Sequence, residues 1–467
     1  MVNDNMVKQL REKAIEAGQG HIFRFWDELS QQSQDRLVQQ VQSIDFELLN
    51  KLKKEYLGET QNNLFQGGLE PTYIIPVPVT DQQKREAGEA KQIGEELLSR
   101  GKVAALLVAG GQGSRLGFEG PKGIFKVGPI SQKSLFQLHA EKIAALQKKY
   151  AATIPWFIMT SETNHNETVA YFQQNKFFNL NEEDIYFFKQ GMIPALDASG
   201  KVFLDEKDHV FSNPNGHGGT LNALWANGCI DEMKKRGIEE IFYFQIDNVL
   251  IKICDPCFLG YHRQKSADMS AKVVSKNDPN EKVGVVGRLN GKLTVVEYSD
   301  LSEADKEARN ADGSLKFRGG SIAIHVFNLQ FIENEISEAK LPYHLAHKKI
   351  NYLDSDGNLI KPDQPNGYKF EMFIFDALQD AKEAVIMEVN RKAEFSPVKN
   401  KEGIDSAETA RQDLINYFAD MLRQAGVDIP ANGGSIEIDA CFALDEEELK
   451  RKIDPAQLKV EFPLYLQ

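Results

Sequence analysis

Cysteine is scarce in this chain, which has 4 cysteines among 467 residues. Small disulfide scaffolds place many more cysteines in a much shorter chain, so that class of protein is excluded. Cys254 and Cys257 have the CxxC spacing of a metal site, but the second pair that a structural zinc site needs is missing. We therefore expect reduced thiols with a structural role.

Long apolar runs are missing as well. No segment approaches the ~18 consecutive apolar residues that cross a bilayer. The first residues, Met-Val-Asn-Asp-Asn, lack the basic segment followed by an apolar one that marks a secretory signal. These absences predict a cytoplasmic location and no membrane partner.

Positive charge is in deficit, because 55 Lys and Arg face 68 Asp and Glu, for a net charge of -13. A nucleic acid needs a broad basic face, so we expect no nucleic-acid partner. A small polyphosphate needs only a few positive groups in one pocket, so the charge does not exclude it. Hydrophobic residues make up 42% of the chain, which is typical of a globular protein, and the length predicts two or three domains.

The spacing of apolar residues divides the chain into three predicted regions. They are a helical N-terminal region (1–99), an α/β domain (100–392) and a small C-terminal domain (393–467). In the first region, helical spacing over residues 37–52 and a helix at Asp81–Ser99 flank Ile74–Val79, where alternating prolines favour an extended connector.

Three wholly apolar runs characterise the middle region, at Val103–Val108, Trp156–Thr160 and Ile241–Ile246. Short apolar runs of this kind are typical of strands buried on both faces. Helical spacing from Leu135 to Leu146 separates the first two runs. The alternation predicts an α/β fold with a central, mostly parallel sheet flanked by helices, in which ligands bind at the carboxyl ends of the strands.

Later segments have other patterns. The stretch Lys272–Tyr298 alternates and contains Asn290-Gly291, which predicts a β-hairpin region. Helical spacing that starts at Leu414 stops near Gly426, and the alternation from Ile436 predicts a small C-terminal β element.

Two further features point to structure rather than chemistry. His344 and His347 have a spacing compatible with one face of a helix, but no third metal ligand is visible beside them. The acidic run Asp445–Glu448 predicts a solvated helix start, where the helix dipole favours carboxylates.

The segment Ala109–Gly123 is the most informative part of the chain. Three glycines among its first five residues allow a sharp turn, and successive N–H groups in such a turn form an anion-binding concavity. Arg115 adds a forked donor that matches phosphate geometry, and Lys122 adds a compact positive charge. This combination predicts a phosphate-binding loop.

Two familiar phosphate loops do not match this segment. The dinucleotide fingerprint needs a sixth-position glycine, but counting from Gly111 that position is Leu116. The P-loop needs Gly-Lys followed by Ser or Thr, but Lys122 is followed by Gly123. The second failure counts against a kinase of the P-loop type.

The loop Leu-Val-Ala-Gly-Gly-Gln-Gly-Ser-Arg-Leu-Gly, followed by Pro-Lys-Gly, resembles the signature of the UDP-sugar pyrophosphorylases (UDPGP type 1). The likeness is closest to the eukaryotic-type UDP-N-acetylglucosamine pyrophosphorylases. Six further motifs follow in the family's order, so that the resemblance covers about residues 100–400. They lie at residues 190–195, 215–219, 246–248, 295–299, 361–367 and 395–400.

The resemblance implies a Rossmann-like, GT-A-like nucleotidyltransferase fold, with residues 100–392 as the catalytic domain. It also implies transfer of UMP from UTP to a sugar 1-phosphate with release of pyrophosphate, forming UDP-N-acetylglucosamine. The implied cofactor is Mg²⁺ or Mn²⁺. Such a reaction needs no protein nucleophile, because positioning and charge neutralisation do most of the work.

The resemblance also implies roles for single residues. Nucleotide binding falls to Gly110, Gly111, Gly113, Gln190 (on the uracil), Gly216, His217 and Gly218. Catalytic positive charge comes from Arg115 and Lys122 on the β- and γ-phosphates, and from Lys399 at the sugar phosphate or α-phosphate. Asp247 is the implied metal ligand. Sugar binding falls to Asn248, Glu297, Asn366 and Lys369.

Three positions depart from the acetylglucosamine members of the family. Ser321 and Ile324 stand where asparagine is expected near the sugar, and His217 also replaces an asparagine. An amide both donates and accepts hydrogen bonds, so these changes leave the sugar open between UDP-N-acetylglucosamine and UDP-glucose, UDP-galactose or UDP-N-acetylgalactosamine. A catalytically silent nucleotide-sugar-binding protein is the alternative of a different class.

Overall fold

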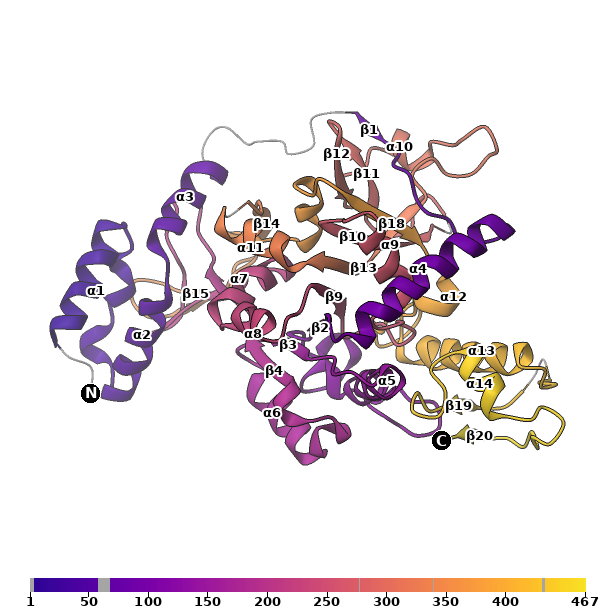
Figure 1. The fold of residues 1–467 in the computed structure, drawn as a ribbon. Coiled ribbons are helices and arrows are strands. Elements are labelled where there is room, and N and C mark those ends of the chain that lie inside the picture. Colours follow the sequence, from indigo (N-terminus) through magenta and orange to yellow (C-terminus); the bar gives the residue numbers. More distant parts are fainter. Residues whose placement is uncertain (1–3, 58–67, 277, 339, 431–432) are drawn as a thin grey trace. The chain divides into compact units, whose positions relative to one another are not determined.

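The structure is a computed structural model that describes residues 4–57, 68–276, 278–338, 340–430 and 433–467 (Figure 1). The chain divides into two compact units. Unit 1 consists of Met1–Gln66, Gly191–Gly219 and Leu341–Ile374, and unit 2 of Gly67–Gln190, Thr220–Lys340 and Phe375–Gln467. The three-part division along the chain at residues 99/100 and 392/393 stays a prediction, because these units follow spatial contacts rather than chain order.

Unit 1 joins a helical layer to short strands from two later parts of the chain. Its helices are α1 (Asp4–Glu16), α2 (Gln31–Ser43) and α3 (Phe46–Tyr56). Its strands are β5 (Met192–Pro194), β6 (Leu204–Glu206), β7 (His209–Val210), β8 (Ser212–Pro214), β14 (His344–Lys348), β15 (Tyr352–Leu353), β16 (Leu359–Ile360) and β17 (Gly367–Glu371). The predicted helical spacing over residues 37–52 is confirmed by α2 and α3, and Asp45 caps the start of α3.

Two glutamine side chains connect these layers of unit 1. The amide of Gln19 donates to Gly200 O at 2.7 Å and accepts from Val202 N at 3.0 Å. The amide of Gln40 forms the same pair of bonds with the backbone of Val210, both at 2.7 Å. Each amide thus satisfies backbone groups that have no strand partner there.

Unit 2 is built on a ten-stranded mixed sheet. The strands are β1 (Leu69–Glu70), β2 (Val103–Val108), β3 (Trp156–Thr160), β4 (Ile185–Lys189), β9 (Glu240–Gln245), β10 (Met269–Ser275), β11 (Val285–Leu289), β12 (Lys292–Val296), β13 (Gly319–Asn328) and β18 (Ala384–Glu388). Strands β9, β2, β3 and β4 form a parallel block, while β13, β12 and β1 run opposite to the others. The predicted parallel core is therefore confirmed within a sheet that is mixed as a whole.

Helices and a small C-terminal sheet complete unit 2. The helices are α4 (Asp81–Ser99), α5 (Leu135–Tyr150), α6 (His165–Gln174), α7 (Thr220–Ala226), α8 (Cys229–Lys235), α9 (Pro256–Gln264), α10 (Glu303–Glu307), α11 (Leu329–Ser337), α12 (Arg391–Glu394), α13 (Ala407–Gln424) and α14 (Glu446–Lys452). Strands β19 (Ile436–Ile438) and β20 (Leu464–Leu466) pair in parallel. The predicted helix that stops near Gly426 and the predicted C-terminal β element are both confirmed.

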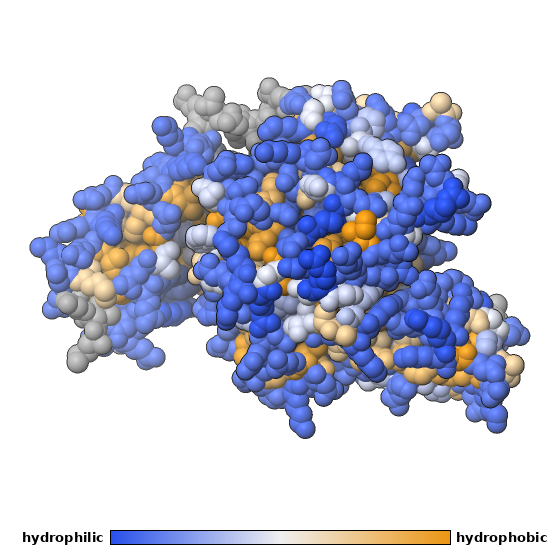
Figure 2. Space-filling view, in the orientation of Figure 1, coloured by the Kyte–Doolittle hydropathy of each residue, from blue (hydrophilic) through white to orange (hydrophobic). Residues whose placement is uncertain are grey.

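The main core of unit 2 lies around the parallel strands. Buried side chains of β2, β3 and β9 pack with those of α5 and α9, in keeping with the wholly apolar runs of the sequence. Helices α4 and α9 approach so closely that a Cβ on Gly94 would lie 1.9 Å from Pro256 O. On the outside, hydrophilic residues dominate the face drawn in Figure 2.

Three expectations from the sequence need correction. His344 and His347 lie on strand β14, where residues three apart point to opposite faces, so they do not share a helical face. Lys272 belongs to β10, outside the hairpin that β11 and β12 form around Asn290-Gly291. The acidic run Asp445–Glu448 does form the start of α14, as predicted, but it is not simply solvated, because Asp445 and Glu448 contact Lys149 at 2.7 and 3.0 Å.

Two absences bear on the sequence-based expectations. All four cysteines are free, as expected for reduced thiols. Within the part of the chain that the structure describes, no helix is long and apolar enough to cross a membrane, and no group of three or more His, Cys, Asp or Glu side chains is arranged to hold a metal ion.

Candidate active site

The glycine-rich loop and Asp247 follow two paired strands. Strands β2 and β9 run parallel, with Val108 opposite Gln245, and Ile246 N donates to Val108 O at 3.1 Å. The chain that leaves β2 enters the loop, and the chain that leaves β9 reaches Asp247 after one residue. Both therefore lie at the carboxyl edge of the parallel block, where ligands bind in open α/β sheets.

The loop closes on itself through backbone hydrogen bonds. Gly113 N donates to Gly120 O at 2.9 Å, and Lys122 N donates to Gly111 O at 3.1 Å. Asn164, buried just before α6, donates from its amide to Ala109 O at 2.9 Å and to Gly111 O at 3.3 Å. Sequence reasoning missed Asn164, whose position between a strand and a helix gives no hint of these partners.

The structure brings Gln190 and the loop glycines together, while their contacts with a nucleotide stay predictions. A Cβ on Gly110 would lie 3.0 Å from Gln190 Nε2, so the amide packs directly over this glycine. Gln190 N donates to Thr160 O at 2.8 Å, which fixes the backbone at the end of β4. By contrast, a Cβ on Gly111 would meet nothing within 4 Å. The loop is thus packed against Gln190 at Gly110 and open at Gly111.

Lys122 and Asp247 form an ion pair at this edge. Lys122 Nζ lies 3.3 Å from Asp247 Oδ2, and the two side chains are only 15% and 12% exposed. Arg115 is exposed, and the described residues offer it no hydrogen bond or ion pair. Of the two cations predicted in the loop, Lys122 is therefore already beside the carboxylate, whereas Arg115 extends into solvent.

The backbone around Asp247 is fixed from two sides. From α5, His139 Nε2 contacts Ile246 O at 3.1 Å, and Lys142 Nζ donates to Val249 O at 2.7 Å and to Ile251 O at 3.0 Å. Burial lowers the pKa of His139 to about 3, so the imidazole is neutral and donates from Nε2. From the other side, Val398 N donates to Asp247 O at 3.0 Å.

The amide of Asn248 is engaged with the chain between α12 and Val398. Its Nδ2 donates to Glu394 O at 2.7 Å, and its Oδ1 accepts from Ser396 N at 3.0 Å. These bonds join the end of β9 to the predicted 395–400 motif. Asn248 thus has a structural role here, and its predicted contact with a sugar stays a prediction.

Two charged side chains lie near Asp247. They are the predicted Lys399 and Asp405, a carboxylate that sequence reasoning missed. Lys399 is exposed, with Nζ 5.8 Å from the centroid of the Phe395 ring. Burial raises the pKa of Asp405; the positive charge of Lys399 opposes this shift, and the negative charge of Asp247 adds to it. These mutual effects place Lys399, Asp405 and Asp247 in one electrostatic neighbourhood.

Glu297 is half-buried just after β12 and borders Gly284.

Another group of predicted residues lies in unit 1. Gly218 N donates to Met372 O at 2.8 Å, and Met372 N donates to Asn215 O at 2.8 Å. A Cβ on Gly216, whose φ is +85°, would lie 2.3 Å from Met372 O. Gly216 and Gly218 therefore allow their backbone to approach the backbone of Met372 closely. This requirement for glycine is independent of any contact with a nucleotide.

His217 is held between these segments. Its Nδ1 accepts a hydrogen bond from Ile374 N at 3.2 Å, and its ring stacks on Phe373 with centroids 5.3 Å apart. Burial lowers the pKa of His217 to about 4, and the charge of His344 lowers it further. The ring is neutral at pH 7 and carries its proton on Nε2.

Asn366 and Lys369 also belong to unit 1. The Asn366 amide donates to Ile350 O at 3.0 Å and accepts from Ile350 N at 2.7 Å, so it pairs with backbone as a strand would. Lys369 lies on β17 with Nζ 5.0 Å from the centroid of the Phe211 ring. Their sugar contacts stay predictions.

The two departures on β13 differ in environment. Ile324 is 1% exposed and packs in the main core of unit 2. Ser321 is half-buried, and its N–H donates to Gly284 O at 2.8 Å. Ile324 thus presents no surface to a ligand in this structure, whereas Ser321 is partly accessible.

Comparisons with known proteins bear on this site. The chain is 38% identical over 444 residues to UDP-N-acetylhexosamine pyrophosphorylase-like protein 1 of Xenopus tropicalis, covering 91% of this chain and 86% of that protein. It is 36% identical over 458 residues to the UDP-N-acetylglucosamine pyrophosphorylase of Saccharomyces cerevisiae, covering 94% and 95%. The crystal structure of the Trypanosoma brucei uridine diphosphate N-acetylglucosamine pyrophosphorylase in complex with inhibitor matches with a TM-score of 0.85 at 25% identity, covering 100% and 99%.

A family model matches residues 49–417, a range that includes the glycine-rich loop, Asp247 and Lys399. With this match over most of its length, the chain belongs to the UDPGP family, described as UTP–glucose-1-phosphate uridylyltransferase.

Proposed function

We propose that this protein transfers UMP from UTP to N-acetylglucosamine 1-phosphate, releasing pyrophosphate and forming UDP-N-acetylglucosamine. The observation that carries the proposal is the ion pair between Lys122 and Asp247, at the carboxyl edge of the parallel strands and next to an open glycine loop, in a chain of the UDPGP family. The names of the similar proteins from Xenopus tropicalis and Saccharomyces cerevisiae support an N-acetylated sugar.

The chemistry is attack by a sugar phosphate oxygen on the α-phosphorus of UTP. In the proposal, the open backbone at Gly111 faces the triphosphate, and Gln190 pairs with the imide edge of uracil. Arg115 and Lys122 neutralise the β- and γ-phosphates as pyrophosphate leaves, and Lys399 neutralises the reacting phosphates. The exposure of Arg115 fits this role, because a side chain with no partner among the described residues is available to the leaving group.

Asp247 fits the requirements of a Mg²⁺ ligand. Mg²⁺ is usually bound by one or two carboxylates together with phosphate oxygens. Oδ2 of Asp247 contacts Lys122, while Oδ1 accepts no hydrogen bond from the residues that the structure describes. When bound, the ion would neutralise charge on the phosphates. The chain's own part is to hold the Asp247 carboxylate in place through the backbone bonds on both sides of it.

The sugar half of the proposal is assigned to Glu297, Asn366 and Lys369, with His217 as a neutral donor on the nucleoside side. The amides of Asn248 and Asn366 already have backbone partners, so a sugar contact would require them to exchange or share those bonds. The buried Ile324 and the half-buried Ser321 supply no amide. UDP-glucose, UDP-galactose and UDP-N-acetylgalactosamine are therefore the products against which the choice of sugar must be tested.

We also propose a cytoplasmic location. Four free cysteines and no disulfide among the described residues fit a reducing compartment.

A panel assay tests the function directly. The protein is incubated with UTP, Mg²⁺ and one sugar 1-phosphate at a time, and pyrophosphate release is measured. We expect the fastest release with N-acetylglucosamine 1-phosphate. Release with glucose 1-phosphate but not with its N-acetylated counterpart would overturn the proposed sugar. UDP-sugar binding without release for any member of the panel would favour the catalytically silent binding protein.

A further inference from the structure

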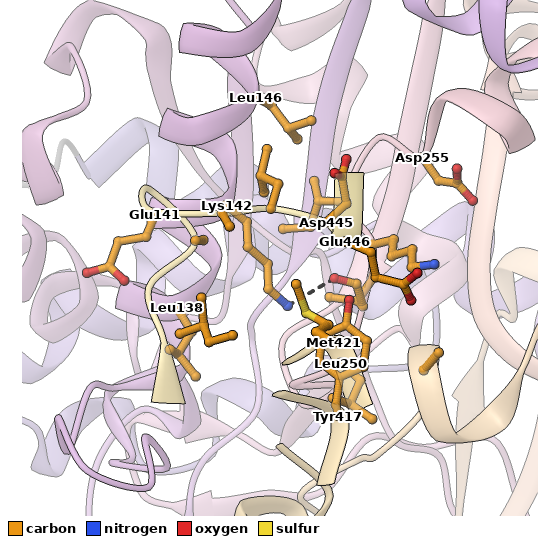
Figure 3. A pocket seen from close by; sticks show the side chains of 18 of the residues that line it. Leu138, Glu141, Lys142, Leu146, Leu250, Asp255, Tyr417, Met421, Asp445 and Glu446 are labelled. Atoms are coloured by element: carbon orange, nitrogen blue, oxygen red, sulfur yellow. Dashed lines mark hydrogen bonds between the residues drawn. The ribbon is translucent and has the colours of Figure 1, made fainter. Parts of the chain in front are cut away.

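A lysine on α5 hydrogen-bonds to the segment that follows Asp247 without touching the site itself. Lys142 Nζ donates to the carbonyls of Val249 and Ile251, at 2.7 and 3.0 Å. Figure 3 shows the Lys142 side chain among the residues that line the neighbouring pocket. Val249 follows Asn248 directly, and a single ammonium group spans the carbonyls of the residues on either side of Leu250. The bonds fix the direction in which the chain leaves Asp247 and Asn248.

The choice of partners is unusual for a lysine in this environment. The side chain borders a cavity of about 410 Å³ whose wall includes Leu138, Leu250 and Met421. Burial there lowers the pKa of Lys142 to about 7, and the distant charge of Glu394 opposes the shift only in part. No carboxylate of the described residues pairs with it. An amine donates hydrogen bonds in either protonation state, so the two carbonyls keep their donor.

A second lysine on the same helix shows the contrast. Lys149, seven residues later, pairs with Asp445 and Glu448 at 2.7 and 3.0 Å and so connects α5 to the start of α14. Ion pairs of that kind satisfy the buried charge directly. Lys142 has no carboxylate partner among the described residues. It donates instead to the carbonyls of Val249 and Ile251, which lie two and four residues after Asp247.

We propose that Lys142 is a positioning residue for the reaction, which holds the Asp247–Asn248 segment in its working geometry through the carbonyls of Val249 and Ile251. His139 holds Ile246 O from the same helix, so α5 fixes the backbone before and after Asp247. The cavity beside Lys142 gives its side chain room to move when the bonds are lost. A displacement of about 1 Å at such a carboxylate is enough to slow the chemistry by about 10- to 100-fold. The inference rests on the proposed function.

The test compares three variants by kcat, by KM for UTP, by UTP affinity in calorimetry and by melting temperature. Lys142→Met removes the donor and should lower kcat about 10-fold or more, with KM and affinity for UTP within about twofold of the wild type. Lys142→Arg keeps donors for both carbonyls and should restore kcat to within about threefold. Lys149→Met, the matched control on the same helix, should lower the melting temperature and leave kcat unchanged.

Three outcomes would overturn the proposal: wild-type kcat in Lys142→Met, an equal loss of kcat in Lys142→Met and Lys149→Met, or no rescue by Lys142→Arg. If Lys142→Met does not fold, Lys142→Gln replaces it, because the shorter amide is a donor that cannot span both carbonyls, and the same losses are expected. An inactive wild type would refute the proposed function, whereas an active wild type with an equally active Lys142→Met would refute the positioning role alone.

Discussion

The glycine-rich loop and the Asp247 segment follow neighbouring strands, yet the protein fixes them to very different degrees. The loop closes on its own backbone, is open at Gly111 and leaves Arg115 exposed without a protein partner among the described residues. The Asp247 segment is hydrogen-bonded from α5 on one side and from residues 394–398 on the other. The difference indicates that the Asp247 carboxylate is held in position before a ligand binds. The groups of the loop at Gly111 and Arg115, in contrast, would find their partners in the bound ligand.

The largest effect is expected from a substitution of Asp247, in the segment that is hydrogen-bonded from both sides. Asp247→Asn keeps the shape of the side chain but removes the charge that pairs with Lys122 and that would hold Mg²⁺. We expect kcat to fall by about 10³-fold, because a preorganised charge at the reacting phosphates is lost. Steady-state pyrophosphate release over a range of Mg²⁺ concentrations measures this.

Asp405→Asn is the matched control for that substitution. Asp405 is a partly buried carboxylate in the same electrostatic neighbourhood, and its φ of +57° is one that asparagine tolerates. We expect less than a tenfold change in kcat. Equal losses in both variants would mean that the total negative charge matters, and not the carboxylate at the end of β9.

The next largest effect is expected from a substitution of Arg115, in the glycine-rich loop. Arg115→Ala should lower kcat by about 10²-fold, because a donor to the leaving pyrophosphate is removed. Because Arg115 contacts no described protein group, folding stability should be unchanged, and the affinity for UMP, which lacks the β- and γ-phosphates, should stay near the wild-type value.

An exposed arginine directly after α4 provides the control for Arg115. Arg100→Ala removes an arginine that is 62% exposed and pairs only loosely with Glu96 at 3.5 Å, so kcat should not change. An equal loss of UMP affinity and of turnover in Arg115→Ala would contradict its assignment to the leaving group.

A smaller effect is expected where the loop is packed. Gln190→Ala removes the amide that lies over Gly110 and should raise KM for UTP by about tenfold, in line with the loss of one or two hydrogen bonds to uracil, with little change in kcat. Gln112→Ala is the control, because its amide belongs to the same loop but, among the described residues, donates hydrogen bonds only to Thr163, at 3.3–3.4 Å. A drop in kcat without a change in KM for Gln190→Ala would place its contact on the phosphates.

The comparison also shows what the sequence could predict. Strands β2 and β3 and helix α4 have the predicted bounds, because continuous apolar runs and a capped amphipathic pattern are local signals. The loop was recognisable for the same reason, since its glycines, Arg115 and Lys122 lie within a few residues of one another. His344 and His347 were misassigned because a spacing of three residues does not by itself distinguish a helix from a strand.

The supports of the site could not be predicted in this way. His139 and Lys142 contact carbonyls that lie 107 and 109 residues away along the chain, and any residue offers a carbonyl. The partners of Asn164, Asp405 and the Asn248 amide depend likewise on how distant segments meet. Unit 1 is assembled from three separated stretches, which composition along the chain does not reveal.

The smallest effect on activity, and a measurable one on stability, is expected from His139→Gln. Burial lowers the pKa of His139 to about 3 in the folded protein, against about 6.5 when unfolded, so protonation favours the unfolded chain. Its contribution to stability is therefore complete above pH 6.5 and is lost as the pH falls from 6.5 toward 3, at up to about 1.4 kcal/mol per pH unit. Glutamine can still donate to Ile246 O but does not titrate, so the variant should keep wild-type kcat at pH 7.5 and lose less stability between pH 6.5 and 4.5. Urea unfolding at several pH values measures the slope; a slope equal to that of the wild type would show that His139 is not the proton-sensitive group on the rigid side of the site.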